Sequence, residues 1–323
     1  MKALLCQQYG PPESLVMEEL PDLQAQNNQV VISVKACGVN FPDTLIIQGK
    51  YQFKPSFPFS PGGEVAGIVK EAGENVTHLK AGDNVFAMPG WGGFAEQLVV
   101  EANRVFKMPP GMDYNVAASL MYTYGTSYHA LKDRAQLRAG ETLLVLGAAG
   151  GVGLAAVNLG KIMGAKVIAA ASSDEKLALC KEYGADGLIN YTTEDLRERL
   201  KALTGGGIDV VYDPVGEPYA EPSLRAMNWK GRYLVVGFAA GQIPALPFNL
   251  SLLKGCSIVG VFWGAFAERE PKSNFQNILE LFQFYQQGTL KPYIHKTYSL
   301  AEAPQALNDM LERRAMGKLV ITP

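Results

Sequence analysis

Short apolar runs alternate with amphipathic stretches through the middle of the chain. Such runs are typical of strands buried on both faces of a parallel sheet. Strands that alternate with helices predict a doubly wound α/β fold. The expected strands are 142–146, 166–171, 187–190, 208–213, 233–237 and 257–261, and the expected helices include 122–135, 154–163, 174–183 and 194–203.

The chain shows a different pattern from Met1 to about Lys107, where short strands are separated by Pro and Gly. This pattern predicts a small, irregular β-barrel rather than a regular sandwich. The expected strands are 30–36, 64–71, 84–88 and 94–100. Near the C-terminus, apolar residues at helical spacing predict a helix over 274–287, followed by a helix over 304–314 and a strand over 318–321.

The length of 323 residues favours two domains. We expect a β-rich domain formed by residues 1–121, an α/β domain over 122–265, and a return of the chain to the first domain over 266–323. We expect the returning segment to pack on the β-rich domain, because it lacks glycine turns of its own.

Composition narrows the possible partners and locations. The formal net charge of −2 provides no basic footprint for nucleic acid, and no apolar run is long enough to cross a bilayer. The N-terminus becomes polar too early for a signal peptide. Four widely spaced cysteines predict buried thiols in a reducing compartment, so we expect a cytoplasmic protein.

A glycine-rich turn, Gly147-Ala148-Ala149-Gly150-Gly151-Val152-Gly153, follows the first strand of the α/β pattern. Glycine lets the backbone approach a ligand, and the N-terminus of the next helix attracts a pyrophosphate. Gly150 and Gly153 match the last two glycines of the Gly-x-Gly-x-x-Gly fingerprint, whereas Ala148 occupies the first place. A plain tight turn is the alternative. The flanking strand and helix favour a dinucleotide site formed by Ala149, Gly150, Gly151 and Val152.

The end of the second strand indicates which dinucleotide binds. An NAD site usually has Asp or Glu there to bind the ribose hydroxyls, but this chain has Ser172 and Ser173, followed by Lys176. Two hydroxyls and an ammonium would attract a 2′-phosphate, so NADPH is the expected cofactor. Asp174 and Glu175 oppose this interpretation, although neighbours on a helix do not share a face with Lys176. A solvated Lys176 is the alternative.

The segment Cys37-Gly38-Val39-Asn40-Phe41-Pro42-Asp43 has two interpretations. Asn40 is a good helix N-cap, Pro42 suits the first turn, and Asp43 complements the helix dipole. Capping alone therefore accounts for all three residues. The functional alternative places Asn40 and Asp43 at the mouth of a cleft, with Tyr51 as a phenolic donor.

Over essentially its full length the chain resembles the zinc-independent quinone oxidoreductases, the zeta-crystallin-like branch of the medium-chain dehydrogenases/reductases. The resemblance depends on segments 36–43, 61–67, 147–153 and 317–320. It implies a GroES-like β-rich catalytic domain, a Rossmann domain, a cleft between them, and a homodimer joined through the strand at 256–263.

The resemblance also implies roles for individual residues. Asn40 and Tyr51 would bind or orient the acceptor, and Asp43 would support their loop. Relatives often have a second tyrosine at the place of Leu45, so the proton donor stays open. Tyr191 either stacks near the adenosine or merely packs. The residues expected around the nicotinamide and its ribose are Thr126, Phe238, Phe262, Trp263 and Lys318, with packing as the alternative for the aromatic ones.

We expect no metal. The zinc alcohol dehydrogenases of the same superfamily carry a ligand Cys where this chain has Asn40 and a ligand His where it has Gly63. Their cysteine-rich lobe is replaced by residues 89–93. The three histidines, His78, His129 and His295, have no ligand spacing.

The expected chemistry follows from the absence of these metal ligands. Oxidation of a simple alcohol benefits from zinc as a Lewis acid, whereas a quinone already accepts hydride readily. The sequence therefore predicts an NADPH-dependent quinone reductase. One alternative is a reductase of enones or of enoyl-CoA such as acryloyl-CoA, and the other is a non-catalytic NADPH-binding protein, crystallin-like or RNA-binding.

Overall fold

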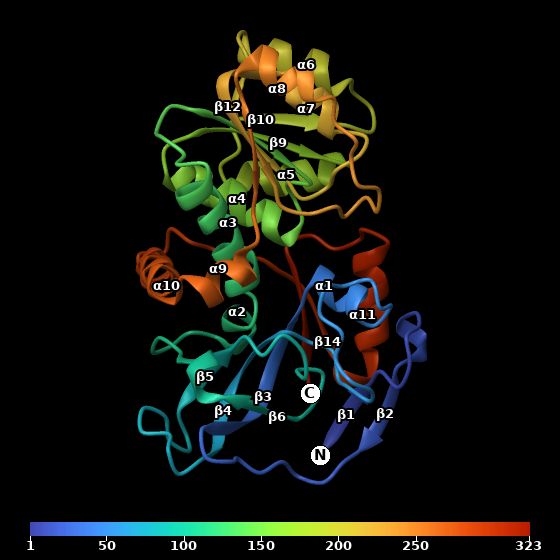
Figure 1. Ribbon diagram of the computed structural model, residues 1–323, viewed down its shortest axis with the longest axis vertical. Helices are drawn as coiled ribbons and strands as arrows, with labels where there is room; N and C mark the ends of the chain where they lie inside the picture. The colour runs from blue at the N-terminus through green and yellow to red at the C-terminus, as the bar shows by residue number, and fades with distance from the viewer. The chain divides into compact units, whose positions relative to one another are not determined.

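The computed structural model describes all 323 residues, which divide into two compact units. The β-rich unit comprises Met1–Tyr122 and Pro292–Pro323, and the α/β unit comprises Thr123–Lys291. Figure 1 shows the elements of each unit.

The α/β unit is built on a six-stranded sheet in which every neighbouring pair is parallel. Its strand order is β10-β9-β8-β11-β12-β13, which confirms the predicted doubly wound fold. The order reverses between β8 and β11, where such sheets bind ligands at the carboxyl ends of their strands. The bounds are β8 Thr142–Leu146, β9 Lys166–Ala171, β10 Gly187–Asn190, β11 Ile208–Asp213, β12 Met227–Val235 and β13 Ser257–Gly260.

Helices cover both faces of this sheet. Figure 1 shows α4 and α5 on one side and α6, α7 and α8 on the other. The helix α6 begins after Asp195, whose side chain accepts a hydrogen bond from the Glu198 amide at 2.9 Å, and it ends at Gly205 in the left-handed conformation. The bounds are α4 Gly151–Ile162, α5 Asp174–Glu182, α6 Leu196–Thr204, α7 Ala220–Arg225 and α8 Phe248–Lys254.

The helix predicted over 122–135 runs from Met121 to Arg134 with two π-helical segments, Met121–Gly125 and His129–Arg134, on either side of α3 (Thr126–Tyr128). π-Helical turns are rare and often occur at functional sites. The short helix α2 (Tyr114–Ala117) precedes it and is capped by the Asp113 side chain.

The chain returns to the β-rich unit at Pro292, not at residue 266 as the sequence suggested. The helices α9 (Trp263–Arg269) and α10 (Pro271–Gln286) stay with the α/β unit. Polar contacts hold α10 there, because the Asn277 amide donates to Asp133 at 2.8 Å and Lys132 donates to Asn277 at 2.9 Å. Apolar spacing predicted this helix correctly but not the unit on which it packs.

The β-rich unit has a branched sheet, where the sequence predicted a small, irregular β-barrel. Its order is β14-β15-β3-β4-β5-β7, with β6 paired to β3. The branch occurs at β3, Gln29–Val39, which is eleven residues long and pairs with β4 from Val30 to Gly38, whereas two shorter strands share its other edge. One edge of β3 pairs with β6 (Gln97–Glu101) near its start and with β15 (Lys318–Thr322) near its end.

The remaining elements of the β-rich unit include a two-stranded sheet, β1-β2, and two helices. The core is formed by aliphatic and aromatic residues from the strands and from α11. The bounds are β1 Lys2–Leu5, β2 Val16–Glu19, β4 Glu64–Ala72, β5 Asn84–Ala87, β7 Val105–Lys107, β14 Ile294–Ser299, α1 Phe41–Ile46 and α11 Ala303–Leu311.

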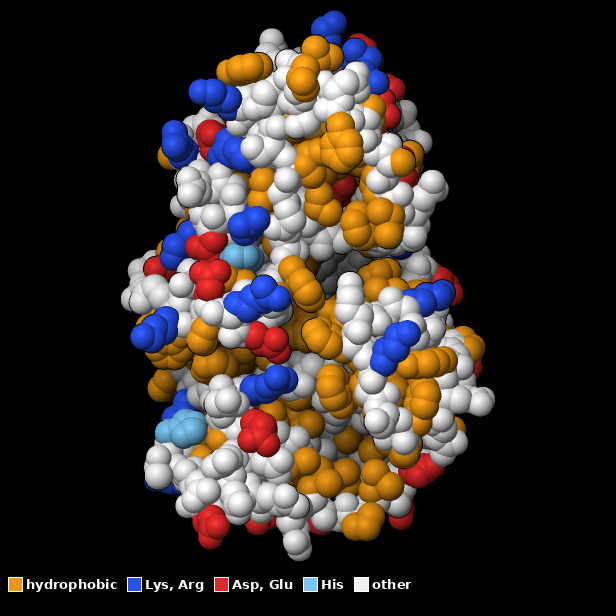
Figure 2. Space-filling model, viewed as in Figure 1, with side chains coloured by type: hydrophobic (Ala, Val, Ile, Leu, Met, Phe, Trp, Pro, Cys, Tyr) orange, Lys and Arg blue, Asp and Glu red, His pale blue; other side chains and the backbone are white.

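Surface and thiol features agree with the composition. All four cysteines are free and buried, as predicted. Figure 2 shows acidic and basic side chains interspersed over the face in view. The helices of the structure are all too short or too polar to span a bilayer. The cytoplasmic location stays a prediction.

Candidate functional site

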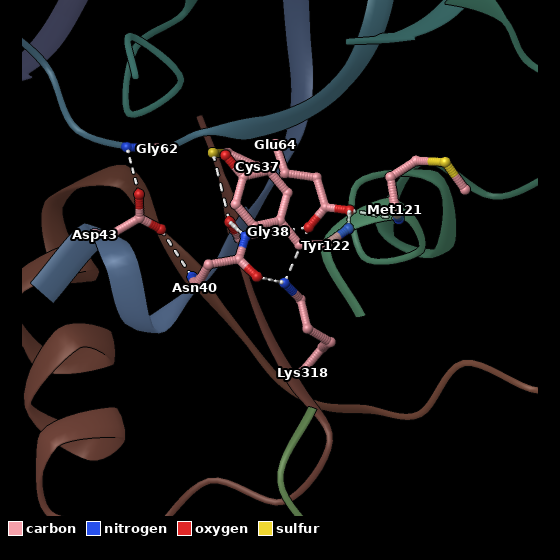
Figure 3. Close-up of polar contacts among 9 residues, drawn as sticks. All are labelled: Cys37, Gly38, Asn40, Asp43, Gly62, Glu64, Met121, Tyr122 and Lys318. Carbon is pink, nitrogen blue, oxygen red and sulfur yellow. Dashed lines mark hydrogen bonds and ion pairs between the residues drawn. The ribbon is translucent and has the colours of Figure 1, made fainter. Parts of the chain in front are cut away.

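A buried polar network lies at the junction of β3, β4 and β15 in the β-rich unit (Figure 3). Its centre is Glu64, which is only 1% exposed. One carboxylate oxygen, Oε1, accepts hydrogen bonds from the backbone amides of Met121 at 2.7 Å and Tyr122 at 3.0 Å. The other, Oε2, accepts from Asn40 Nδ2 and Lys318 Nζ, each at 3.1 Å. We call this set of contacts the Glu64 network.

Strand register brings these distant residues together. Glu64 is the first residue of β4 and pairs with Gly38, near the end of β3. On the other edge of β3, Leu319 of β15 pairs with Val39. Lys318, which precedes Leu319, therefore lies beside Asn40, which follows Val39. The network is thus set by two pairings that no local pattern specifies.

Asn40 holds the network together through its side-chain amide. Its Nδ2 donates to the carbonyl oxygen of Gly38 and to Glu64, each at 3.1 Å, and its Oδ1 accepts from Lys318 Nζ at 2.7 Å. Both amide hydrogens are therefore used within the protein. Of the two roles that the family resemblance implies for Asn40, binding or orienting the acceptor, this geometry favours the second, and the role stays a prediction.

Asp43 supports the loop around Asn40. Its carboxylate accepts from the backbone amides of Asn40 at 2.7 Å and Gly62 at 3.2 Å. Asn40 is the N-cap of α1, and its side chain also belongs to the Glu64 network. The carboxylate of Asp43, at the third position of the helix, accepts from the N-cap amide as in a capping box. Burial raises the pKa of Asp43 to about 6.

The raised pKa of Asp43 predicts a pH-dependent contribution to stability. The folded state binds this proton more tightly than the unfolded chain, so the contribution is complete below about pH 4 and is lost as pH rises through about 6. The stability advantage of wild type over Asp43→Asn should fall by about 2–3 kcal/mol between pH 4 and pH 7. Urea unfolding of both proteins at each pH measures it. An advantage that grows with pH would contradict the assignment.

Tyr51 lies close enough to Asp43 for their charges to interact. Its ring packs against the core of the β-rich unit and meets Phe53 edge to face, with centroids 5.8 Å apart. Burial raises the pKa of the Tyr51 phenol, and Asp43 raises it further. The hydroxyl therefore stays protonated at neutral pH and can act as a hydrogen-bond donor.

In the α/β unit, the glycine turn connects β8 to α4 with a tight bend. Gly147 adopts φ +57°, so the left-handed residue stands one position before Ala148, the place at which the fingerprint expected glycine. A Cβ on Gly153 would lie 2.3 Å from the Gly147 carbonyl oxygen. Close packing of the turn on the helix therefore requires glycine at 153.

The predicted phosphate-binding side chains meet after β9. Lys176 Nζ donates to Ser172 Oγ at 3.1 Å, and Ser173 caps α5 by accepting from the Lys176 amide at 3.3 Å. Asp174 is held by Asn190, whose Nδ2 donates to it at 2.8 Å. The nearby Asp174 carboxylate thus has an amide partner.

The structure brings most of the remaining candidate cofactor residues to the carboxyl edge of the parallel sheet. Tyr191 follows β10, Phe238 follows β12, and Phe262 follows β13. Thr126 lies on α3, next to Ser127, whose Oγ donates to the Val152 carbonyl oxygen in the glycine turn at 2.8 Å. Parallel strands place these segments at one edge, although their roles stay predictions.

Two aromatic candidates are engaged in packing. The Tyr191 ring lies against Tyr219, with centroids 4.2 Å apart. Trp263 is buried, and its Nε1 donates to Asn274 Oδ1 at 3.1 Å. Trp263 therefore contacts α10 through Asn274, and its role at the nicotinamide stays a prediction. Phe262 is half exposed.

Sequence reasoning missed Glu64 and Tyr122 as site residues. A charged residue at the first position of a buried strand was the available signal for Glu64, because burying a carboxylate requires partners. No sequence signal pointed to Tyr122. No group of three or more His, Cys, Asp or Glu residues is placed to hold a metal ion. Burial raises the pKa of the Cys37 thiol, which keeps it neutral.

Comparisons with known proteins agree with this geometry. Residues 26–110 match the family described as alcohol dehydrogenase GroES-like domain, and residues 151–283 match the family described as zinc-binding dehydrogenase. The chain is 39% identical to quinone oxidoreductase-like protein 2 homolog of Nematostella vectensis, over 99% of this chain and 88% of that protein.

Two solved structures are similar over nearly the whole chain. The Escherichia coli quinone oxidoreductase complexed with NADPH superposes with a TM-score of 0.94 and 29% identity, over 100% of both chains. The enoyl reductase CurK superposes with a TM-score of 0.89 and 27% identity, over 99% of this chain and 98% of that one.

Proposed function

This chain belongs to the quinone oxidoreductase family of the medium-chain dehydrogenases/reductases, and on that premise we propose that it reduces quinones with NADPH. The reaction is a hydride transfer that uses no metal. The observation that carries the choice of NADPH is the contact between Lys176 and Ser172 at the carboxyl edge of the parallel sheet. The quinone acceptor is proposed from the family.

The residues of the α/β unit fit NADPH. The backbone of the glycine turn and the N-terminus of α4 would hold the pyrophosphate, and Ser172, Ser173 and Lys176 would hold the 2′-phosphate. The similar Escherichia coli enzyme is complexed with NADPH. When bound, the reduced nicotinamide supplies the hydride.

The β-rich unit supplies the groups for the acceptor. Tyr51 offers a protonated phenol, and Asp43 and Asn40 hold the surrounding loop. A hydrogen bond to a carbonyl oxygen stabilises the negative charge that develops there as hydride arrives. An electrophilic quinone requires no further activation by a metal ion.

A second candidate function is the reduction of an enone or of an enoyl-CoA. The similarity to the enoyl reductase CurK favours it, because that protein shares the fold over nearly its whole length. Both candidate reactions place negative charge on a carbonyl oxygen, so the same donors serve either acceptor.

The decisive experiment is steady-state NADPH oxidation with four acceptors: 1,4-benzoquinone, 9,10-phenanthrenequinone, 2-cyclohexenone and acryloyl-CoA. We expect the quinones to have the highest kcat/KM, and exhaustive chelation with EDTA to leave that rate unchanged. Preference for acryloyl-CoA would replace the proposal with the second candidate. Tight NADPH binding without turnover of any acceptor would favour a non-catalytic NADPH-binding protein, and inactivation reversed by added zinc would overturn the metal-free assignment.

We also propose a homodimer, formed through β13. This strand is at the edge of the parallel sheet, pairing within the chain only with β12, and Ile258 on it is 38% exposed. An unpaired edge is a template for pairing with a second chain. Light scattering should report about twice the chain mass of 34.9 kDa.

A further inference from the structure

Tyr122 occupies the space beside Gly63. A Cβ at Gly63 would lie 2.8 Å from Tyr122 Oη and 2.9 Å from the Gly90 carbonyl oxygen. Real Cβ atoms do not approach other atoms this closely, so the tyrosine hydroxyl is accommodated because residue 63 has no side chain. In the zinc alcohol dehydrogenases that position carries a ligand histidine. Here a phenol fills the space instead.

The backbone of Tyr122 is fixed by the Glu64 network. Its amide donates to Glu64 Oε1 at 3.0 Å, next to the Met121 amide at 2.7 Å. Glu64 is in turn held by Asn40 and Lys318. Figure 3 shows the Tyr122 ring reaching across this network toward Cys37. The backbone from which the phenol projects is therefore held by buried, paired groups.

Four ionisable side chains interact electrostatically with the Tyr122 hydroxyl: Asp43, Tyr51, Glu64 and Cys37. Burial raises the pKa of Tyr122 strongly, and these neighbours raise it further. The phenol is thus kept protonated and ready to donate. Tyr51 is held in the same state by burial and by Asp43.

The two tyrosines are more exposed to solvent than the other polar side chains of the site. Asn40, Asp43, Glu64 and Lys318 are at most 7% exposed. Tyr51 and Tyr122 are mostly buried but keep a part of their surface exposed. Among the polar side chains gathered here, the two phenols are therefore the ones placed to meet a small molecule.

We propose that Tyr122 is a second acceptor-binding residue that donates a hydrogen bond, together with Tyr51, to the carbonyl oxygen of the acceptor. This inference rests on the proposed reductase function and extends it to a carbonyl-bearing acceptor held by two phenols. This chain has Leu45 where relatives often have a second tyrosine, and Tyr122 would provide a second phenol from a different element of the fold. Tyr122 acts as a donor to developing negative charge and does not need to lose its proton.

The test compares Tyr122→Phe with Tyr114→Phe. The control removes a hydroxyl that bonds Asn84 at 2.6 Å elsewhere in the β-rich unit. Tyr122→Phe should lower kcat with 9,10-phenanthrenequinone and with 2-cyclohexenone by about tenfold or more, while the KM for NADPH and the Tm stay near wild type. Tyr114→Phe should leave kcat unchanged. Equal kcat in both variants would overturn the proposal.

Two further measurements keep the result interpretable. Gly63→Ala should reproduce the loss of kcat, because its Cβ displaces the Tyr122 hydroxyl; unchanged kcat in that variant contradicts the proposal.

Duroquinone binding to the NADP⁺-loaded protein, where no reaction can occur, should weaken at least about threefold in Tyr122→Phe. If wild type reduces no quinone, the proposed function fails, and enone turnover or duroquinone binding still decides the role of Tyr122. The proposed role of Tyr122 is overturned if wild type and Tyr122→Phe bind duroquinone equally, or if neither binds it.

Discussion

Replacing Lys318 with methionine is expected to destabilise the protein by about 3–5 kcal/mol. Methionine preserves most of the side-chain volume but removes the ammonium that donates to Glu64 Oε2 at 3.1 Å and to Asn40 Oδ1 at 2.7 Å. Both charged side chains of this pair are at most 5% exposed. The variant therefore leaves a buried carboxylate without its cation. Equilibrium urea unfolding measures the loss.

A double variant and a surface control make this result specific. Lys318→Met/Glu64→Gln should recover at least about half of the lost stability, because a neutral amide costs much less to bury than an unpaired carboxylate. Lys70→Met removes an exposed ion pair with Asp22 in the same unit, and its effect should lie within experimental error. A small loss in Lys318→Met, or no recovery in the double variant, would show that the pairing does not stabilise the fold.

Lys176→Ala is expected to raise the KM for NADPH by about tenfold while hardly changing the KM for NADH. The ammonium lies 3.1 Å from Ser172 Oγ, so the two groups can converge on one phosphate. A charge-assisted hydrogen bond to a 2′-phosphate is worth about 1.5–3 kcal/mol, which corresponds to roughly ten- to a hundredfold in affinity. NADH lacks this phosphate and should be unaffected.

The matched control for this prediction is Lys181→Ala. Lys181 is exposed in the last turn of the same helix, α5, so its removal changes the net charge equally. It should leave the KM for both cofactors near wild type. Equal increases for NADPH and NADH in Lys176→Ala would remove this lysine from the phosphate site.

The elements of the α/β unit were predictable because their signals are local. The strands β9, β10 and β11 begin and end where the apolar runs predicted, and α5 begins at the predicted Asp174. Most residues of these strands are buried, and a glycine lies at or shortly before the start of each one: Gly164, Gly187 and Gly207. Ser172 and Lys176 could be placed together from sequence because they are only four positions apart, on either side of the α5 N-cap Ser173.

The Glu64 network was not predictable in the same way. Lys318 and Asn40 are 278 positions apart, and Glu64 and the Tyr122 amide are 58 positions apart. Only the register of β3 with β4 and with β15 brings them into contact. The family resemblance pointed to Asn40, Asp43 and Lys318 separately. It did not indicate that a buried carboxylate joins two of them.

The sequence by itself determined the alternation of strands and helices, the glycine turn and the two serines that directly follow the second strand, because each is a property of neighbouring residues. Tertiary structure alone decided that α10 stays with the α/β unit, that Asn40 turns inward to Lys318 and Glu64, and that Tyr122 stands over Gly63. These outcomes depend on strand register and on the need to pair a buried charge, and both join residues that are far apart in the chain.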